Sequence, residues 1–521
     1  MLRERPYWYA LYADVPDALE LPSQFDPEVR ESHADWLAGG ARGRLLDVPK
    51  YQPTQCFWSR LGACEILPSG ALPDPRIMWR LGSWQPEGAE FLNTRVAALL
   101  GDEQAAGKAV MSSLAIPYGA SVIYVCRATG VHDQARKIQA WRPDMLVSKW
   151  RRQDFVRWPQ PAEVAVISMD SLPRPRGLSA SDPVERRRAA VERMLPRGRW
   201  GGVLILDEVD KLSTPRTHRR LAAEAIARRA SRRWGLTGTP MSNVPENLKE
   251  VLKLLGLFRC AFHSEAEFDE LLGVQRGREE GEHGGRSRGG NVSPVVRERM
   301  QRVYLRRTWR DLGGLDEPRF IRTAVDIDHA YIDELIAAAG GLAAVLERVK
   351  HPGFGDISEM ARLRQGLALA KLPVAVDRVR AHLEEGAPVI VYCYHVEPLH
   401  QLQRALGRDA CGLIVGSVSV ARRDKVIAGF CAGRTPVVAI SGAGEDTIDL
   451  IRRDDIPYQA LVRIDISWAP RSNGQVVGRA RRPGMRWPLI VEDLIADHAL
   501  EHHVHAIVEQ KESVMRAAGI L

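Results

Sequence analysis

The chain has 521 residues, of which 45% are hydrophobic and 26% are charged, values typical of a globular protein with a large buried core. At roughly 150 residues a domain, this length accommodates about three domains. No stretch approaches the ~20 consecutive apolar residues that cross a bilayer, and residues 1–16 lack the apolar run of a signal peptide. The seven cysteines form no CxxC pair, which argues against a disulfide framework and a zinc clip. We therefore expect a cytoplasmic protein that is neither secreted nor bound to a membrane.

The charge balance gives a modest indication of a partner. Lysine and arginine number 73 against 65 aspartates and glutamates, which leaves a formal net charge of +8. A positive surplus favours a polyanion such as nucleic acid. Taken alone it is a weak signal, because many basic proteins bind none.

The first half of the chain alternates short apolar runs with helical patterns. Residues 1–75 are rich in Trp, Tyr and Pro, and we expect a small accessory domain there. Over 76–258 the alternation predicts parallel strands joined by crossover helices. The predicted strands are 121–126, 164–168, 202–206 and 234–238, and 221–230 is a predicted helix.

A second alternation of the same kind follows a linker. Residues 259–370 are more helical and contain GREEGEHGGRSRGGN (277–291), whose glycines and charges predict a mobile loop. The second α/β pattern spans 371–500, and a helix is expected over 501–521. Its predicted strands are 387–393, 436–441 and 461–466. The sequence therefore predicts the α/β class, with two doubly wound parallel-sheet domains that face a cleft.

Two carboxylates follow a predicted strand in GGVLILDEVDKL (201–212). Asp207 and Glu208 stand at its carboxyl end, the edge where open α/β sheets bind ligands. One carboxylate can hold Mg²⁺, and the next can orient a water for attack on a γ-phosphate. A solvated acidic loop is the ordinary alternative for a lone DE pair.

A candidate phosphate loop occurs in LLGDEQAAGKAVMSSLAI (99–116). An apolar run leads through a loop of small residues to Gly107 and Lys108 and then into a helical pattern. Main-chain N–H groups at such a helix start can bind phosphate, and the lysine can reach its oxygens. A GK pair alone is common and is more often a turn.

An arginine-containing face is predicted in RSNGQVVGRARRPG (471–484). Gln475, Arg479 and Arg482 are spaced i, i+4 and i+7, which places them on one side of a helix. Two guanidiniums aimed at one place neutralise the charge that develops in phosphoryl transfer. A solvated basic face is the alternative.

The three sites, in this order, resemble the Swi/Snf-like branch of the superfamily-two helicases and translocases, from about Trp79 onward. GDEQAAGKA resembles the family's ADEMGLGKT, DEVD stands at its DEAH-type box, and GLTGTPMSNVPENL resembles its LTGTP motif. ISWAPRSNGQVVGRARRPG is similar to the family's W-N-P and Q-x-x-G-R-A-x-R segments, and YLRRTWRDL resembles its inter-domain LRR segment. Residues 361–379 and 389–402 also resemble the annealing-helicase branch.

The resemblance implies two RecA-like domains, ATP and Mg²⁺ as cofactors, and ATP-driven movement along duplex DNA, in the cytoplasm or at the nucleoid. It implies that Asp207 holds magnesium and that Glu208 activates water. It implies that Thr237, Gly238 and Thr239 couple hydrolysis to nucleic acid and that Arg479 and Arg482 complete the site. The residues implied in nucleotide binding are Gln85, which would contact adenine, Asp102, Gly107, Lys108, Ala109 and Gln475.

Several departures from the family pattern keep other functions open. Ala105 and Ala106 replace the usual glycines, and Ala109 stands where Ser or Thr would offer a hydroxyl to magnesium. Residues 442–450 carry Glu445 and Asp446 where glycine is expected. One alternative is therefore a nucleic-acid-binding clamp with weak ATPase activity, and another is an RNA-directed or strand-separating helicase.

Overall fold

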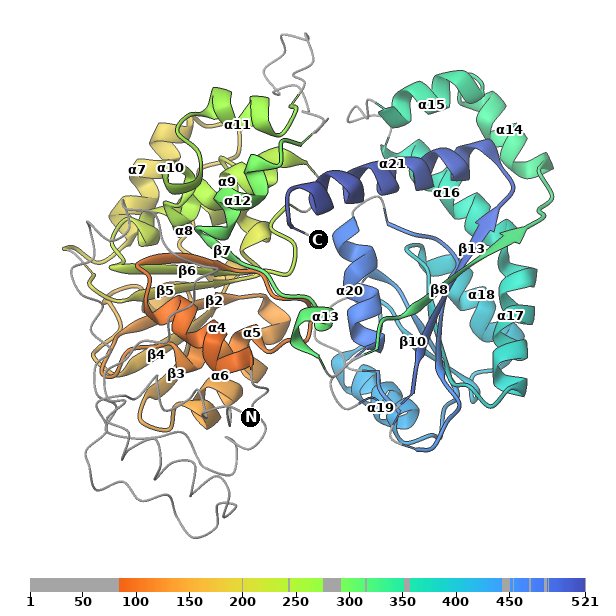
Figure 1. Ribbon diagram of the computed structural model, residues 1–521, viewed down its shortest axis with the longest axis horizontal. Coiled ribbons are helices and arrows are strands. Elements are labelled where there is room, and N and C mark those ends of the chain that lie inside the picture. The colour runs from red at the N-terminus through yellow and green to blue at the C-terminus, as the bar shows by residue number, and fades with distance from the viewer. Residues whose placement is uncertain are drawn as a thin grey trace. The chain divides into compact units, whose positions relative to one another are not determined.

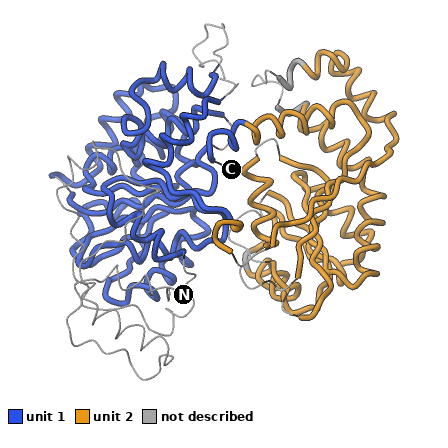
Figure 2. Tube along the Cα trace, in the orientation of Figure 1, with its two compact units in different colours: residues 1–308, 514–521 blue, residues 309–513 orange. Residues whose placement is uncertain are grey.

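A computed structural model of the chain contains two α/β units, and it describes residues 84–520 with gaps. The gaps are residues 199, 242–243, 275–291, 314–315, 351–356, 443–449, 453, 468–469, 482–484 and 486. The expected accessory domain over 1–75 and the expected loop over 277–291 lie outside the described residues. Unit 1 covers Met1–Thr308 and Val514–Leu521, and unit 2 covers Trp309–Ser513 (Figure 2).

Unit 1 is built on a seven-stranded sheet in the order β3-β4-β2-β5-β6-β1-β7, with every neighbouring pair parallel. The strands are β1 (Ala97–Leu100), β2 (Val122–Cys126), β3 (Leu146–Trp150), β4 (Glu163–Ser168), β5 (Val203–Asp207), β6 (Arg232–Leu236) and β7 (Tyr304–Leu305). The α-helices are α4 (Trp84–Asn93), α5 (Lys108–Leu114), α6 (Val131–Trp141), α7 (Val184–Met194), α8 (His218–Ala227), α9 (Pro245–Leu255), α10 (Phe258–Ala261), α11 (Glu265–Leu271) and α12 (Val295–Gln301). Helices α4, α5 and α6 cover one face of the sheet, and α8 and α9 lie on the other (Figure 1).

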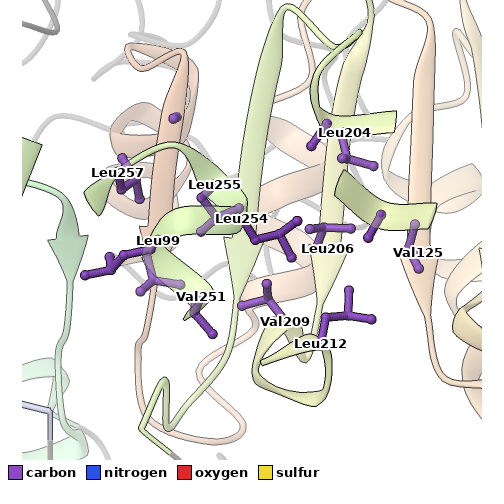
Figure 3. Close-up of a cluster of buried hydrophobic side chains, with 14 of the residues drawn as sticks. Leu99, Val125, Leu204, Leu206, Val209, Leu212, Val251, Leu254, Leu255 and Leu257 are labelled. Atoms are coloured by element: carbon purple, nitrogen blue, oxygen red, sulfur yellow. The ribbon is translucent and has the colours of Figure 1, made fainter. Parts of the chain in front are cut away.

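The central strands β1, β2 and β5 of unit 1 are buried and almost wholly apolar because helices cover both faces of the sheet. Side chains alternate between the faces, so that Val125 and Leu206 enter the cluster packed by α9 (Figure 3). Helix α9 begins with a proline in its first turn and is followed by Gly256, whose φ of 76° suits a helix terminus. Its buried Leu248 and Leu252 are one turn apart and face the sheet.

Unit 2 is built on a six-stranded sheet in the order β10-β11-β9-β12-β13-β8, also parallel throughout. The strands are β8 (Arg319–Val325), β9 (Val389–Tyr392), β10 (Cys411–Ile414), β11 (Val437–Ile440), β12 (Gln459–Arg463) and β13 (Leu489–Ala496). The helices are α13 (Trp309–Leu312), α14 (Ala330–Ala338), α15 (Leu342–Lys350), α16 (Ile357–Ala370), α17 (Leu372–Glu384), α18 (Val396–Leu406), α19 (Val420–Cys431), α20 (Pro470–Ala480) and α21 (Ala499–Ala517).

The core of unit 2 likewise has two layers, one on each face of its sheet. Val389 and Val391 pack with residues of α16, α17 and α18, whereas Ile390 and Tyr392 pack with residues of α19 and α20. This alternation along β9 places helices on both faces. The predicted α/β class with two doubly wound parallel sheets is therefore confirmed.

Each of the seven strands predicted from the sequence is present, within a few residues of the expected bounds. The strands not predicted as such are β1, β3, β7, β8, β10 and β13. The described part of 259–370 divides between the units, since α10, α11, α12 and β7 belong to unit 1 and α13–α16 with β8 belong to unit 2. The expected cleft between the domains stays a prediction.

Candidate nucleotide-binding site

The loop between β1 and α5 turns at two residues with positive φ. Ala105 has a φ of 67° and Gly107 a φ of 86°, both in the left-handed region that favours glycine. Glycine is required at 107, because a Cβ there would lie 2.0 Å from Nε2 of Gln85. Within the described chain, the main-chain N–H groups of Gly107, Lys108 and Ala109 donate no hydrogen bond. The loop therefore has the free donors that a phosphate group needs.

Helix α4 holds this loop from one side. Nε2 of Gln85 donates to the carbonyl oxygen of Ala106 at 3.2 Å, and Nε1 of Trp84 donates to the same oxygen at 2.9 Å. Gln85 thus lies against the phosphate loop, as its assignment to the nucleotide site requires. Its contact with an adenine stays a prediction.

Lys108, the first residue of α5, extends back over the loop. Its Nζ donates to the carbonyl oxygens of Asp102 at 2.6 Å and Glu103 at 3.1 Å. Burial lowers the pKa of Lys108 to about 8, against the attraction of Asp102, Asp207 and Glu208. Asp207 and Glu208 favour the charged form of the lysine and so oppose the lowering of its pKa.

Asp207 is the last residue of β5, so its carboxylate lies at the carboxyl edge of the sheet. Its Oδ2 accepts from the hydroxyl of Tyr124 at 3.3 Å and from Nε2 of Gln134 at 3.2 Å. Burial, with repulsion from Glu208, raises the pKa of this carboxyl to about 6, while Lys108 opposes the shift. A half-buried carboxylate with so high a pKa gains from a bound cation, and oxygen is the ligand that Mg²⁺ prefers.

Glu208 follows in a left-handed conformation with a φ of 51°, which turns its side chain away from the line of the strand. Its Oε2 lies 2.9 Å from Nε of Arg127, the residue that follows β2. The exposed fraction is 22% for the arginine side chain and 25% for the glutamate side chain. A left-handed glutamate is uncommon and is a form of strain found at functional sites. The carboxylate is therefore fixed in place by the backbone and by a guanidinium.

The predicted coupling loop lies between the acid pair and the phosphate loop. Oγ1 of Thr237 donates to Oδ1 of Asp210 at 2.7 Å, and the N–H of Thr239 donates to Oγ1 of Thr237 at 3.2 Å. A Cβ on Gly238 would lie 3.8 Å from Nζ of Lys108. The structure thus brings Thr237, Gly238 and Thr239 together with both halves of the site.

Two arginines that the sequence indicated only as part of the linker also reach the site. Arg307 forms a buried ion pair with Asp102, in which Nη2 lies 2.5 Å from Oδ2, and Arg306 donates through Nη1 to the carbonyl oxygens of Gly101 and Gly238. Burial opposes the charge of Arg307, but Asp102 and Glu87 outweigh it and raise its pKa. The double arginine was the available signal, but no spacing rule links it to residues 200 positions earlier.

Ala109 offers no side-chain oxygen, and its nearest hydroxyls are engaged elsewhere. Oγ of Ser113 donates to the carbonyl oxygen of Ala109 at 2.7 Å, and Oγ of Ser112 donates to the same atom at 3.0 Å. The residues present fit a magnesium ion held by Asp207 and water, because Mg²⁺ readily keeps several waters. They do not offer the hydroxyl ligand that the family pattern places after the lysine.

The site residues predicted in the second domain belong to unit 2. Gln475 is buried on α20 and, in the amide orientation that satisfies both groups, its oxygen accepts from Nη2 and Nε of Arg471 at 3.0 and 3.1 Å. Arg479 is half-buried on the same helix. The helix ends at Ala480, and Arg482 lies outside the described residues, as do Glu445 and Asp446. A helical face shared by Gln475, Arg479 and Arg482 therefore stays a prediction.

Unit 1 combines a doubly wound parallel sheet, a helix start with free N–H groups, and a half-buried lysine beside two half-buried carboxylates at the carboxyl edge. These features define an α/β domain of the nucleoside-triphosphate-binding class. Residues 84–320 match the family model of the SNF2-related domain. This match supports the resemblance of the chain to the Swi/Snf-like family of superfamily-two helicases and translocases.

A solved structure similar to the chain is the Sulfolobus solfataricus SWI2/SNF2 ATPase core in complex with double-stranded DNA. The two share 16% identity, with 84% of this chain and 93% of that chain covered and a TM-score of 0.37. No curated protein sequence matches the chain. Support for the family resemblance comes from the domain match. Separately, none of the helices in the described ranges has the length and apolar character needed to cross a membrane.

Proposed function

We propose that the chain is an ATP-dependent DNA translocase of the Swi/Snf-like type. The observation that carries this proposal is the convergence of Lys108, Asp207, Glu208 and Gly238 at one edge of the first sheet, inside the SNF2-related domain. These residues come from three separate motifs of the chain, because Asp207 and Glu208 are neighbours in one of them. If these residues were only a turn with a solvated lysine and a solvated acid pair, nothing would require them to lie close together.

The roles of the residues in ATP hydrolysis follow from their chemistry. The N–H groups of the phosphate loop and Nζ of Lys108 bind the β- and γ-phosphates, and Gln85 supports the loop from the adenine side. Asp207 holds Mg²⁺, which when bound neutralises phosphate charge and orients the leaving group. Glu208 orients the attacking water and accepts its proton. Arg479 and Arg482, supplied by unit 2, neutralise charge in the transition state.

The coupling loop connects hydrolysis to the nucleic-acid side. The hydrogen bond between Thr237 and Asp210 joins this loop to the segment that carries the acid pair. A change at the γ-phosphate therefore has a short, buried route to Thr239 and beyond. The net charge of +8 favours a phosphate backbone, and duplex DNA is the partner proposed from the family resemblance.

A second function is favoured by one observation, the alanine at position 109. Two serine hydroxyls, of Ser112 and Ser113, donate to its carbonyl oxygen, and neither occupies the position directly after the lysine. Weak magnesium binding would leave a clamp that binds DNA and turns over ATP slowly. Turnover measured over a range of magnesium concentrations separates this clamp from a translocase.

The translocase is tested by displacement of a third strand from a triplex site on a linear duplex. We expect ATP-dependent displacement without separation of a forked duplex, and DNA binding that weakens as salt rises. Unwinding of the fork would identify a strand-separating helicase, and a preference for RNA would identify an RNA-directed one. Salt-insensitive binding without displacement would contradict the proposal.

A further inference from the structure

The chain segment before unit 2 forms part of the floor of the phosphate loop. Residues 303–307 run beside 99–103, where the N–H groups of Gly101 and Glu103 donate to the carbonyl oxygens of Leu305 at 2.7 Å and Arg307 at 2.9 Å. Strand β7 is thus the edge strand next to β1, and the phosphate loop begins where this pairing ends.

Arg307 holds the first turn of the loop through a bidentate contact. Its Nε and Nη2 donate to the two oxygens of Asp102 at 3.1 and 2.5 Å, and its main-chain N–H donates to Oδ1 at 3.0 Å. Its Nη1 donates to Oε2 of Glu87 on α4 at 2.6 Å. One guanidinium therefore joins the phosphate loop to the helix that carries Gln85, and both Arg307 and Asp102 are buried.

Arg306 makes a different connection. Its Nη1 donates to the carbonyl oxygen of Gly101 at 2.8 Å and to that of Gly238 at 3.2 Å. These carbonyls belong to the start of the phosphate loop and to the coupling loop. Arg306 also lies close enough to Lys108 for its charge to oppose that of the lysine.

We infer that Arg306 and Arg307 are positioning residues of the nucleotide site. Arg307 sets the phosphate loop against α4 through Asp102 and Glu87, and Arg306 sets it against the coupling loop through Gly101 and Gly238. Neither arginine needs to touch the nucleotide. Because unit 2 starts at Trp309, the chain that enters unit 2 is held by the site itself.

The two arginines have separable effects on ATP turnover if the proposed function holds. Arg307→Lys keeps the charge but loses the bidentate contact, so the loop and Gln85 lose their common support. We expect the KM for ATP to rise about tenfold with little change in kcat. Arg306→Gln leaves that support intact but frees the coupling loop, and we expect kcat to fall about tenfold with KM unchanged. Displacements of about 1 Å can cost as much as 100-fold, which makes these effects measurable.

The inference is tested without nucleotide by hydrogen exchange. In Arg307→Lys we expect the amides of residues 99–107 to exchange at least about tenfold faster, and in Arg306→Gln those of 99–107 and 235–241. The matched control is Arg302→Gln, which lies a few residues earlier and loses only an exposed ion pair with Glu298. This control should exchange and hydrolyse ATP like the unmodified chain.

The outcomes distinguish the two proposals. If the unmodified chain hydrolyses no ATP, the proposed function fails, whereas the exchange data still decide the inference. Exchange rates in both variants equal to those of Arg302→Gln would overturn it. If Arg307→Lys does not fold, the exchange data for Arg306→Gln still test the inference, because Arg306 is only half-buried. If neither variant folds, the inference is overturned, because the arginines then have a purely structural role. Equal falls in kcat and rises in KM in both variants would contradict their separate tasks.

Discussion

Protonation of the Asp207 carboxyl group directly affects the proposed binding of magnesium at the site. Burial and Glu208 raise its pKa to about 6, above its ordinary value of 3.8. Below that pH the nucleotide-free carboxyl is protonated and loses the charge that holds a cation. We therefore expect Mg²⁺ affinity, measured by calorimetry without nucleotide, to be fully present well above about pH 6 and to fall as the pH drops through it. Affinity that is flat across this range would contradict the role of Asp207.

The Glu208 carboxylate is the proposed base, and its removal separates binding from hydrolysis. Glu208→Gln keeps the shape of the side chain, so ATP should still bind. Turnover should fall by about 100-fold or more, the usual scale for loss of a general base. The control is Glu298→Gln on α12, an exposed residue outside the site. Near-normal turnover of Glu208→Gln in a single-turnover assay would remove Glu208 from the mechanism.

Position 109 tests how magnesium is held. Ala109→Thr would add the hydroxyl that the family pattern places after the lysine, and we expect it to lower the magnesium concentration needed for half-maximal turnover. Ser113→Ala should change little, because that hydroxyl is bonded to the carbonyl of Ala109. The reverse result, an inert Ala109→Thr and an inactive Ser113→Ala, would mean that the loop holds the ion differently.

At the scale of elements, the junction of β1, the phosphate loop and α5 depends on one glycine. Gly107→Ala places a Cβ 2.0 Å from Nε2 of Gln85 and strains a φ of 86°. We expect a loss of ATP affinity of at least about tenfold, with a destabilisation of about 1 kcal/mol or more from the backbone strain. Gly119→Ala is the matched control, because it has a φ of 69° with nothing within 4 Å of the added atom. ATP affinity equal in both variants would contradict the close packing of Gln85 on the loop.

The sequence was most informative where an element is buried on both faces. Strands β2, β4 and β5 have apolar, buried centres, and the acid pair at the end of β5 could therefore be placed at the sheet edge in advance. Strands β3 and β8 lie at the sheet edges and leave most of their residues exposed or only partly buried, so their sequences lack that signature. Strand β7 has two residues and is defined only by its pairing with β1.

At the scale of the whole molecule, motifs near one another in the chain were predictable, but contacts between distant segments were not. Lys108 and Asp207 were each indicated by a local pattern, and Gln85 was implied by the family resemblance. Tyr124 and Gln134 reach Asp207 from more than 70 residues away, and Arg307 reaches Asp102 across about 200. Such pairings depend on the strand order, which no local pattern in the sequence encodes.

The central claim is that this chain hydrolyses ATP in response to duplex DNA. The most direct measurement is steady-state ATP turnover with and without duplex DNA, compared with single-stranded DNA and RNA and repeated with Glu208→Gln. We predict that duplex DNA stimulates turnover more than the other nucleic acids and that Glu208→Gln abolishes the stimulated rate while leaving DNA binding intact. Turnover that is indifferent to every nucleic acid, or equally fast in Glu208→Gln, would contradict the account.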